Sequence, residues 1–378
     1  MGKFSRLILP GIILQSVLIG GGFATGREIV EFGGKYGASG WISGVAIFLG
    51  FTLLAILTFE ACRQWHVFDY KSLLKRLIGR GWIAYEISYL LLSVLIIAVM
   101  ASAAGEILKD TLGLSVWVGI VLIIVLVGFL NYMGENFIAS MKTIGTVALF
   151  AAYTIFSFSV YAHRSEEIML VFRQWDTSYS EDAPGFLLLI WTGITYVGYN
   201  LGVYPASFFT IKKIQSRKES VIAGIIAGLL MTIPWFLTYL AIMAYYPNPE
   251  IIGASVPWLK LLTPFGSTFI VIFGIVVGWT LVETATGVIH AFINRLDVDI
   301  YQTTGKNLTG FRKGIISLIA LIIAMLLAQI GIIDLIAKGY TYMAYAMILF
   351  FGIPLLAIAP KLLGKSDRST LPNQLPQQ

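Results

Sequence analysis

Long uninterrupted apolar runs are the feature of this sequence that most restricts its fold. One run, VWVGIVLIIVLVGFL from Val116 to Leu130, contains no charged residue. An α-helix needs about 20 such residues to cross a bilayer, whereas strands of a membrane barrel alternate apolar and polar residues, which these runs do not. The chain is 57% hydrophobic and only 12% charged, while a soluble domain is roughly a quarter charged. The sequence therefore predicts an all-α integral membrane protein.

Ten runs of this kind are predicted to be membrane-spanning helices, although the fourth and the ninth are short. They are Leu7–Phe32, Trp41–Cys62, Trp82–Ala104, Val116–Tyr132, Ile138–Tyr161, Phe186–Phe209, Val221–Tyr245, Ser267–Phe292, Ile315–Ile330 and Leu335–Ala359. Two loops also carry a helical pattern. Phe68–Gly79 is basic and amphipathic, as is typical of a helix on the inner membrane surface, and Glu166–Trp175 is predicted to cap the outer face.

Basic residues are concentrated in the loops on one side of the ten predicted helices. With the N-terminus inside, inner segments hold 18 of the 26 Lys and Arg residues and outer segments hold six, while Arg27 and Lys142 lie within spans. Cytoplasmic loops are enriched in Lys and Arg, so we expect a multi-pass plasma-membrane protein with both termini cytoplasmic. The same bias accounts for the net charge of +6 without a nucleic-acid partner. The single cysteine, Cys62, excludes an intrachain disulfide.

The longest stretch outside the predicted helices, Ala162 to Ala183, divides them into five and five. We therefore predict a first five-helix repeat in residues 1–163, a second in residues 184–362 and a disordered polar tail in residues 363–378. Five is an odd number, so the second repeat is inverted relative to the first. Each half opens with a glycine-interrupted helix, GGGFATG in the first and YVGYNLG in the second. Interrupted helices at matching positions of inverted repeats indicate a transporter's binding site.

The interruptions suggest what could bind there. A break in a membrane helix frees backbone N–H and C=O groups, which are tolerated only in a cavity or buried in protein. A half-helix N-terminus suits a carboxylate, and freed carbonyl oxygens suit an ammonium group or a metal cation, so an amino acid would satisfy both. The alternative is that the glycines only allow close packing of helices.

Three short motifs make the chain resemble a known superfamily. GGGF (Gly20–Phe23) resembles the G-x-G motif in the first helix of the amino acid–polyamine–organocation superfamily, TYVGYN (Thr195–Asn200) resembles its F-x-G-F-E stretch in the sixth helix, and LNYMGENF (Leu130–Phe137) resembles its N-Y-x-G entry to the fifth. Within it, the chain is most similar to the YkvI-like amino acid permeases. The resemblance implies the leucine-transporter (LeuT) fold, a 5+5 inverted repeat with discontinuous helices 1 and 6.

The resemblance also implies where a substrate binds. The implied residues, with Ala24 and Thr25 added as neighbours in the expected pocket, are Gly20, Gly21, Gly22, Phe23, Ala24, Thr25, Gly198, Tyr199 and Asn200. Tyr199 falls where the family often has an aromatic gate, and Asn200 stands where many permeases have glutamate. This set carries no obvious counter-charge, so a neutral amino acid is the expected substrate, while nearby Glu28 leaves amines open.

The eighth predicted helix supplies a candidate cation site. Thr280, Glu283 and Thr284 share one helical face, and an ionisable residue deep in a membrane is a functional candidate. In the LeuT fold, hydroxyl residues at about this depth complete a sodium site, which the resemblance places near Thr284 and Thr286. Glu283 would ligate Na⁺ or carry a proton, and the alternative is a structural hydrogen bond. We expect no cofactor beyond the coupling ion, Na⁺ or H⁺.

Three charged residues follow the first break toward the outer side: Arg27, Glu28 and Glu31. They form a candidate outer gate, but Arg27 and Glu31 are spaced i, i+4 and could simply pair. Glu60 lies at the cytoplasmic end of its helix, where a structural or gating role is expected.

The sequence carries no metalloprotease, Walker or hydrolase motif, so we do not expect an enzyme. We expect a secondary active transporter that carries a small amino-acid-like solute with Na⁺ or H⁺ by alternating access. Two alternatives are a non-transporting receptor that senses amino acids and an ion channel, although a channel would not explain two matched helix breaks. The sequence leaves the substrate, the coupling ion and the oligomeric state open.

Overall fold

The computed structural model describes residues 3–133, 135–180 and 182–363, apart from the side chains of residues 3, 4, 21 and 132–147. Every regular element within these residues is a helix. The first half contains α1 (Lys3–Leu18), α2 (Gly21–Ala24), α3 (Arg27–Glu31), η1 (Gly34–Gly40), α4 (Trp41–Trp65), α5 (Tyr70–Ile78), η2 (Gly79–Gly81), α6 (Trp82–Leu112), α7 (Val116–Met133) and α8 (Glu135–Gln174).

The second half begins after the α8 extension. It contains α9 (Phe186–Tyr199), η3 (Asn200–Ser207), α10 (Phe208–Ile211), α11 (Arg217–Met243), α12 (Pro249–Ile252), α13 (Pro257–Leu262), η4 (Thr263–Phe265), α14 (Ser267–Thr304), α15 (Gly310–Ala328), α16 (Ile332–Asp334), η5 (Leu335–Tyr340), α17 (Thr341–Met347), η6 (Ile348–Gly352), α18 (Ile353–Ile358) and α19 (Pro360–Leu363).

The helices match the predicted spans in place. Among the described residues, seven helical segments are long and apolar enough to cross a membrane. The other three predicted spans are the interrupted first helix, the shorter α7, and α8, whose early side chains lie outside the described set. Large apolar side chains such as Leu122, Val125 and Leu318 are exposed, which suits a surface that faces lipid.

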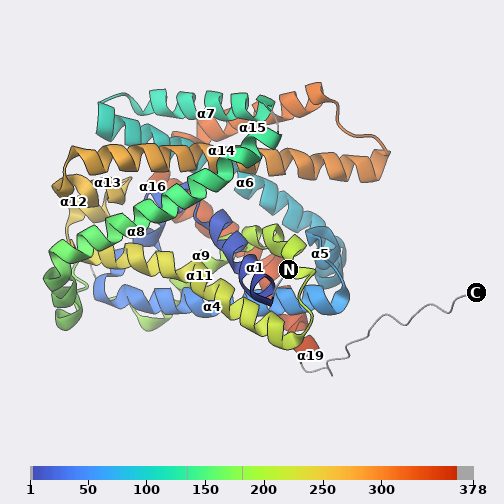
Figure 1. The fold of residues 1–378 in the computed structure, drawn as a ribbon, viewed down its shortest axis with the longest axis horizontal. Coiled ribbons are helices and arrows are strands. Elements are labelled where there is room, and N and C mark those ends of the chain that lie inside the picture. The colour runs from blue at the N-terminus through green and yellow to red at the C-terminus, as the bar shows by residue number, and fades with distance from the viewer. Residues whose placement is uncertain (1–2, 134, 181, 364–378) are drawn as a thin grey trace, which may run out of the picture.

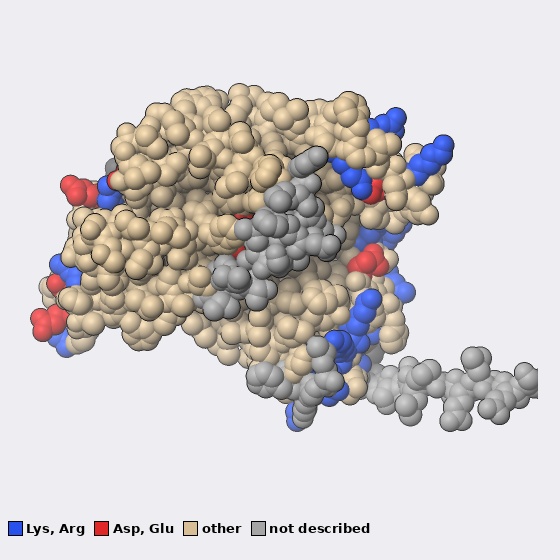
Figure 2. All heavy atoms as spheres, turned by 45° about the horizontal axis from the view of Figure 1, so that its top comes forward, with Lys and Arg blue, Asp and Glu red and all other residues tan. Residues whose placement is uncertain are grey.

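The helices form two sides with α8 crossing between them. α7, α14 and α15 pack together on one side and α4 packs along α11 on the other, while α8 runs obliquely and contacts both α11 and α14 (Figure 1). α5, α19 and the N-terminus lie at one end of the molecule, here called the α5 end, and α12 and α13 lie at the opposite, α12 end (Figure 1). Figure 2 shows charged side chains gathered mostly at these two ends, with few of them on the visible surface between.

The first helix is discontinuous, as the glycines predict. α1 ends at Leu18, Ile19 and Gly20 are not helical, α2 makes a single turn, and Thr25 and Gly26 separate it from α3. Gly26 has a φ of 83°, a conformation that glycine adopts at no steric cost. Gly21 belongs to α2, but its surroundings lie outside the described residues.

The sixth helix is discontinuous in a different way from the predicted unwinding at Gly198–Gly202. α9 ends at Tyr199 and continues directly as the 3₁₀-helix η3, so the chain tightens without opening. Pro205 lies inside η3, and because proline has no N–H it cannot donate the α-helical bond to residue 201. A Cβ at Gly198 would lie 2.7 Å from the Ile348 side chain. Gly198 therefore serves close packing, the alternative reading of this break.

Both loops with a helical pattern are helical. Asp69 caps α5 by accepting a hydrogen bond from the Ser72 N–H (2.8 Å), and Leu73, Leu74 and Leu77 are buried beneath it. The segment Glu166–Trp175 is mostly the end of α8, which extends past a kink at Arg164 as far as Gln174. The tenth helix contains two π-helical stretches, η5 and η6, a distortion that is frequent at functional sites.

Candidate functional site

Glu28 joins the two interrupted helices at the centre of the candidate site. It lies on α3, directly after the break, and is only 5% exposed. Its Oε2 accepts a hydrogen bond of 2.6 Å from the hydroxyl of Tyr199, the last residue of α9. This bond spans 171 positions of sequence. Glu28 therefore faces the sixth helix from inside the protein, and it supplies an acidic group beside the predicted substrate residues, which contain none.

Gly22 makes room for this carboxylate. A Cβ at position 22 would collide with Oε1 of Glu28 and would also contact the Val99 side chain. Gly20 faces a different neighbour, because a Cβ there would lie 3.1 Å from the Thr284 methyl group. Gly22 and Gly20 thus allow the backbone of the break to lie close to Glu28 and Thr284, respectively.

The carbonyl groups of the break are already bonded within the protein. The Thr25 hydroxyl donates to the Gly22 carbonyl (2.7 Å), the Trp258 N–H donates to the Thr25 carbonyl (3.2 Å), and the Tyr153 hydroxyl donates to the Ala24 carbonyl. These three oxygens are therefore not open ligands, contrary to the expectation from freed backbone groups. The carboxyl of Glu28 is the acidic group that this part of the site presents.

Three aromatic rings pack against the ring of Tyr199. Its ring stacks on Tyr340 of η5 with centroids 4.5 Å apart, meets the edge of Tyr196 at 5.4 Å and lies 5.6 Å from Phe32. Tyr196 is fully buried, and its hydroxyl has no hydrogen-bond partner among the described residues. Tyr153, Tyr196 and Tyr340 escaped the sequence reasoning, although tyrosines inside apolar runs could have indicated them.

The remaining predicted substrate residues take other positions. Asn200 donates from Nδ2 to the Tyr196 carbonyl (2.9 Å) and so closes the end of α9. Phe23 is buried with its ring centroid 6.3 Å from that of Tyr153. Of the predicted set, the structure thus brings Gly22 and Tyr199 together with Glu28, while Gly198 and Asn200 support the helix itself.

The three charged residues of the candidate gate separate into two groups. Arg27 pairs with Glu31 (3.1 Å), which confirms the predicted pair, and Lys35 also pairs with Glu31 (2.5 Å). Arg27 donates further to the carbonyl oxygens of Ile252 (2.6 Å) and Ala254 (3.3 Å) near α12. Arg27 and Glu31 thus tie α3 to the α12 end, whereas Glu28 does not belong to this ion-pair cluster.

A second polar site lies beside Ile19 and Gly20. A small pocket there is lined by Ser16, Ile19, Leu149, Phe150, Thr280, Glu283 and Thr284. The structure therefore brings together Thr280, Glu283 and Thr284, as their shared helical face predicts. Thr286 does not line the pocket, because its buried hydroxyl donates to the Val282 carbonyl (2.7 Å). Ser16 was missed, although a serine one turn before Gly20 in an apolar run is a signal for it.

No described group of three or more His, Cys, Asp or Glu residues could hold a metal ion. An ion in the Glu283 pocket would have a single carboxylate beside the hydroxyls of Ser16, Thr280 and Thr284. Hard oxygen ligands of this kind suit a hard cation, and a protonated Glu283 would need none.

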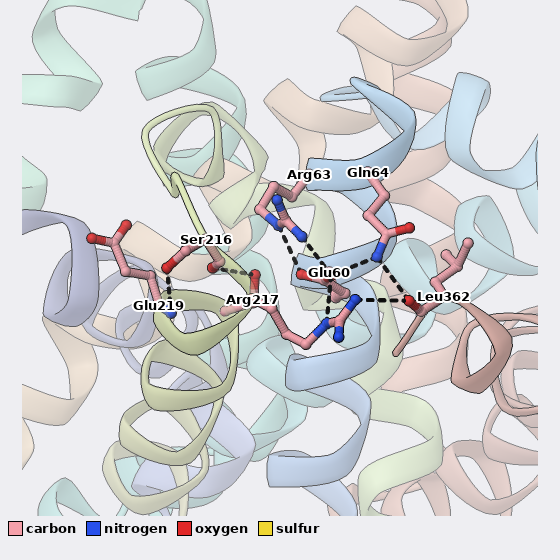
Figure 3. A network of polar contacts seen from close by, with 8 residues as sticks. Glu60, Arg63, Gln64, Ser216, Arg217, Glu219 and Leu362 are labelled. Carbon is pink, nitrogen blue, oxygen red and sulfur yellow. Dashed lines mark hydrogen bonds and ion pairs between the residues drawn. The ribbon is translucent and has the colours of Figure 1, made fainter. Parts of the chain in front are cut away.

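Another buried carboxylate, Glu60 on α4, lies at the α5 end. Figure 3 shows Arg63, Gln64 and Arg217 pointing at it, with nitrogen–oxygen distances of 2.6, 2.6 and 3.5 Å. Gln64 and Arg217 also donate to the Leu362 carbonyl of α19 (2.8 and 3.3 Å). Glu60 therefore fastens α4, α11 and α19 to one another.

The architecture is that of a membrane protein with the LeuT fold, as comparison with solved structures shows. A substrate-bound, outward-open Na⁺-coupled sialic acid symporter superposes with a TM-score of 0.55 at 15% identity, over 94% of this chain and 86% of that one. A mutant of the Eremococcus coleocola manganese transporter gives a TM-score of 0.54 at 13% identity, over 94% and 79%. The predicted fold class is confirmed.

Comparison of sequences gives a relative along nearly the whole chain. The "Uncharacterized membrane protein YkvI" of Bacillus subtilis is 24% identical over 377 residues, which cover 95% of this chain and 97% of the relative. No protein-family model matches the chain. The resemblance to YkvI is confirmed. The division into residues 1–163 and 184–362 stays a prediction, and the predicted disordered tail lies, from residue 364 onward, outside the described residues.

Proposed function

We propose that this protein is a secondary active transporter that carries a small amino-acid-like solute across the membrane together with a cation, by alternating access. One observation carries the proposal: the interrupted first helix has a separate polar site on each part of its break. The Glu283 pocket lies beside Ile19 and Gly20, and the Glu28–Tyr199 contact lies beside Gly22. In secondary transporters, discontinuous helices of this kind form both the substrate site and the coupling-ion site.

Two of the solved structures with this fold support the proposal, because both are transporters. One is a Na⁺-coupled symporter and another is a manganese transporter, so the shared fold serves coupled uptake in at least one of them. We assign the solute to the region of Glu28 and Tyr199. We assign the coupling ion to Thr280, Glu283 and Thr284, with Na⁺ favoured over H⁺ because the hydroxyl oxygens lie beside the carboxylate.

The membrane orientation is part of the proposal. The N-terminus, α5 and α19 share the α5 end (Figure 1), and that end carries the lysine and arginine residues of Lys71–Arg80 and of the α14–α15 connection. By the enrichment of basic residues in cytoplasmic loops, this end faces the cytoplasm of a plasma-membrane protein. Arg27, Glu31 and Lys35 then close the outer side, and Glu60 with Arg217 closes the inner side.

The test is uptake into proteoliposomes with imposed sodium or proton gradients, screened against amino acids and amines. Glu283→Gln should strongly weaken sodium dependence if Na⁺ is the coupling ion. If H⁺ is the coupling ion, the variant should still exchange solute in counterflow but fail to concentrate it, because a permanently neutral group cannot carry protons. Glu167→Gln, at an exposed position on the α8 extension, is the matched control and should behave as wild type.

Two results would go against this proposal. Solute binding without any flux under either gradient would favour the non-transporting receptor. Unchanged concentrative uptake by Glu283→Gln under both gradients would remove Glu283 from the coupling site and leave it a structural residue.

A further inference from the structure

The two ends of the molecule differ in how their basic side chains are paired. Toward the α12 end, most described lysine and arginine side chains have a carboxylate oxygen within 3.6 Å, as Lys35, Arg164, Lys260 and Lys338 do. At the α5 end, Asp69 is an exposed carboxylate that caps α5. The same end presents exposed basic side chains that form no ion pair with a described carboxylate (Figure 2): Lys75, Arg76, Arg80, Lys212, Lys218, Lys306, Arg312 and Lys361.

Four of these charges gather around α5. The leucines of α5 are buried against the protein, whereas Lys75 and Arg76 are exposed and Arg80 follows in η2. The Nζ of Lys212, from the α10–α11 connection, lies 5.9 Å from the ring centroid of Phe68, just before α5. The fold thus brings two separate segments together into one surface, and its four basic residues, Lys75, Arg76, Arg80 and Lys212, are here called the basic patch.

Tryptophan rings place the basic patch at the membrane interface. The Arg76 guanidinium lies 5.8 Å from the ring centroid of Trp65, the last residue of α4, and the Lys75 Nζ lies 5.6 Å from that of Trp82, the first residue of α6. Tryptophan is enriched at membrane interfaces, where its ring sits at the level of the lipid headgroups. A basic amphipathic helix between two such tryptophans is suited to lie in the plane of the membrane surface.

An apolar stripe continues from the basic patch along α6. Ile83, Ile87 and Leu91 are spaced four residues apart, so they share one helical face, and they are 52%, 55% and 56% exposed. On a membrane helix, acyl chains cover such a stripe. It begins three residues after Arg80, so a lipid whose chains cover the stripe has its headgroup at the level of the basic patch.

The combination of patch and stripe selects the kind of partner. Clustered Lys and Arg residues on an amphipathic helix attract anionic lipid headgroups, and the planar guanidinium of arginine matches the oxygens of a phosphate. A zwitterionic lipid would cover the apolar stripe without compensating the charge, and a soluble anion would do the reverse. An anionic lipid does both.

We infer that the basic patch binds the phosphate headgroup of an anionic lipid, and that this lipid fastens α4 to α6 through α5. α4 packs along α11, and α6 packs against α7 and α14, so the two helices belong to opposite sides of the molecule. A headgroup between Lys75 and Arg76 contacts a residue that lies over Trp82 and one that lies over Trp65. The inference goes beyond the proposed function, because it concerns neither the solute nor the coupling ion.

The first measurement is the affinity of the purified full-length protein for two lipids. The protein in a neutral detergent is titrated with dioleoylphosphatidylglycerol or dioleoylphosphatidylcholine, and bound lipid is followed by native mass spectrometry. We expect phosphatidylglycerol to bind at least about tenfold more tightly, since each basic residue near a headgroup contributes about fivefold. Added salt should weaken its binding, because ions screen exposed charges. Equal affinity for the two lipids would overturn the inference.

Matched double variants locate the site. Lys75→Gln with Arg76→Gln should weaken phosphatidylglycerol binding at least about tenfold, whereas Lys75→Arg with Arg76→Lys keeps both charges and should bind as wild type. Lys306→Gln with Arg312→Gln is the control, because it removes two exposed charges of the same end near the α14–α15 connection and should leave the affinity unchanged. If both glutamine variants lose the same affinity, the lipid responds only to the general charge of this end and the inference fails.

Thermal unfolding and competition complete the test. Phosphatidylglycerol should raise the apparent Tm of wild type and of the control but not of the Lys75→Gln, Arg76→Gln variant, because a ligand that binds the folded form stabilises it. Glycerol phosphate and polyglutamate should not displace the lipid at the same concentration of charge. Displacement by either would assign the basic patch to a soluble anion and rule out the lipid. A double variant without a single peak in size-exclusion chromatography is replaced by its two single substitutions.

Discussion

Glu28 and Glu60 are both buried carboxylates, 5% and 1% exposed, yet their surroundings are opposite. Glu60 receives hydrogen bonds from Arg63, Gln64 and Arg217, so the protein itself compensates its charge (Figure 3). Among the described residues, Glu28 receives one from the neutral hydroxyl of Tyr199.

Burial alone therefore does not tell whether a carboxylate holds helices together or is available to a ligand. A carboxylate with protein cations around it holds helices together and has little left to offer a ligand. A carboxylate among aromatic rings is costly unless something neutralises it, so its surroundings make sense when a ligand or a proton completes them. Removal of Glu60 should therefore affect stability most, and disturbance of Glu28 should affect transport most.

The largest expected effect follows from Gly22→Ala. The new methyl group would occupy the place of Oε1 of Glu28, and the carboxylate can move aside, so the fold is kept while its bond to Tyr199 is lost. A displacement of about 1 Å at a binding group can cost about a hundredfold in rate, and solute uptake into proteoliposomes should fall by that order. Gly274→Ala is the control, because nothing lies within 4 Å of a Cβ there. Equal uptake by the Gly22 variant and wild type would place the solute site elsewhere.

A middle-sized effect on stability is expected at the other carboxylate. Glu60→Gln removes the anion that Arg63 and Arg217 contact, and loss of hydrogen bonds to a charged group should lower the free energy of unfolding by about 1–3 kcal/mol. The apparent Tm in detergent micelles measures it. Glu28→Gln should change the apparent Tm much less. If both variants lower it equally, the proposed contrast between the two carboxylates is wrong.

The double variant Glu60→Gln with Arg217→Gln sharpens the same contrast. The losses of stability caused by substitutions within one network are not additive. Arg217→Gln should therefore lower the free energy of unfolding less in the Glu60→Gln background than it does alone. Strictly additive losses would show that Arg217 contributes to stability independently of Glu60.

The smallest effect is expected for an ion pair at the surface. Arg164 and Glu167 lie 3.1 Å apart, with side chains 34% and 44% exposed. Exposed pairs contribute about 0–1 kcal/mol, so Glu167→Gln should shift the apparent Tm by no more than the error of the measurement. A loss as large as that of Glu60→Gln would mean that burial does not separate structural from surface carboxylates in this protein.

Local properties of the sequence predicted the helices and the first break. The apolar runs fix which segments lie in the membrane, the triple glycine fixes where the first helix opens, and the apolar spacing of Phe68–Gly79 fixes α5. The shared face of Thr280, Glu283 and Thr284 is also local, since it depends only on helical periodicity, and the pocket includes all three. Thr286, which only the resemblance placed near a sodium site, does not line this pocket, because two further residues turn a side chain to another face.

Only the tertiary structure decided which polar groups meet. Glu28 was predicted from its sequence neighbours to be part of an outer gate with Arg27 and Glu31, but the fold turns it to Tyr199, 171 positions away. It likewise brings Arg217 to Glu60 and packs Gly198 against Ile348. Hydropathy and periodicity are properties of adjacent residues, whereas the compensation of a buried charge depends on side chains that other helices bring to it. For this reason the sequence determined where the chain crosses the membrane and where the first helix breaks, and the packing of the helices determined which buried carboxylate is compensated by side chains of other helices.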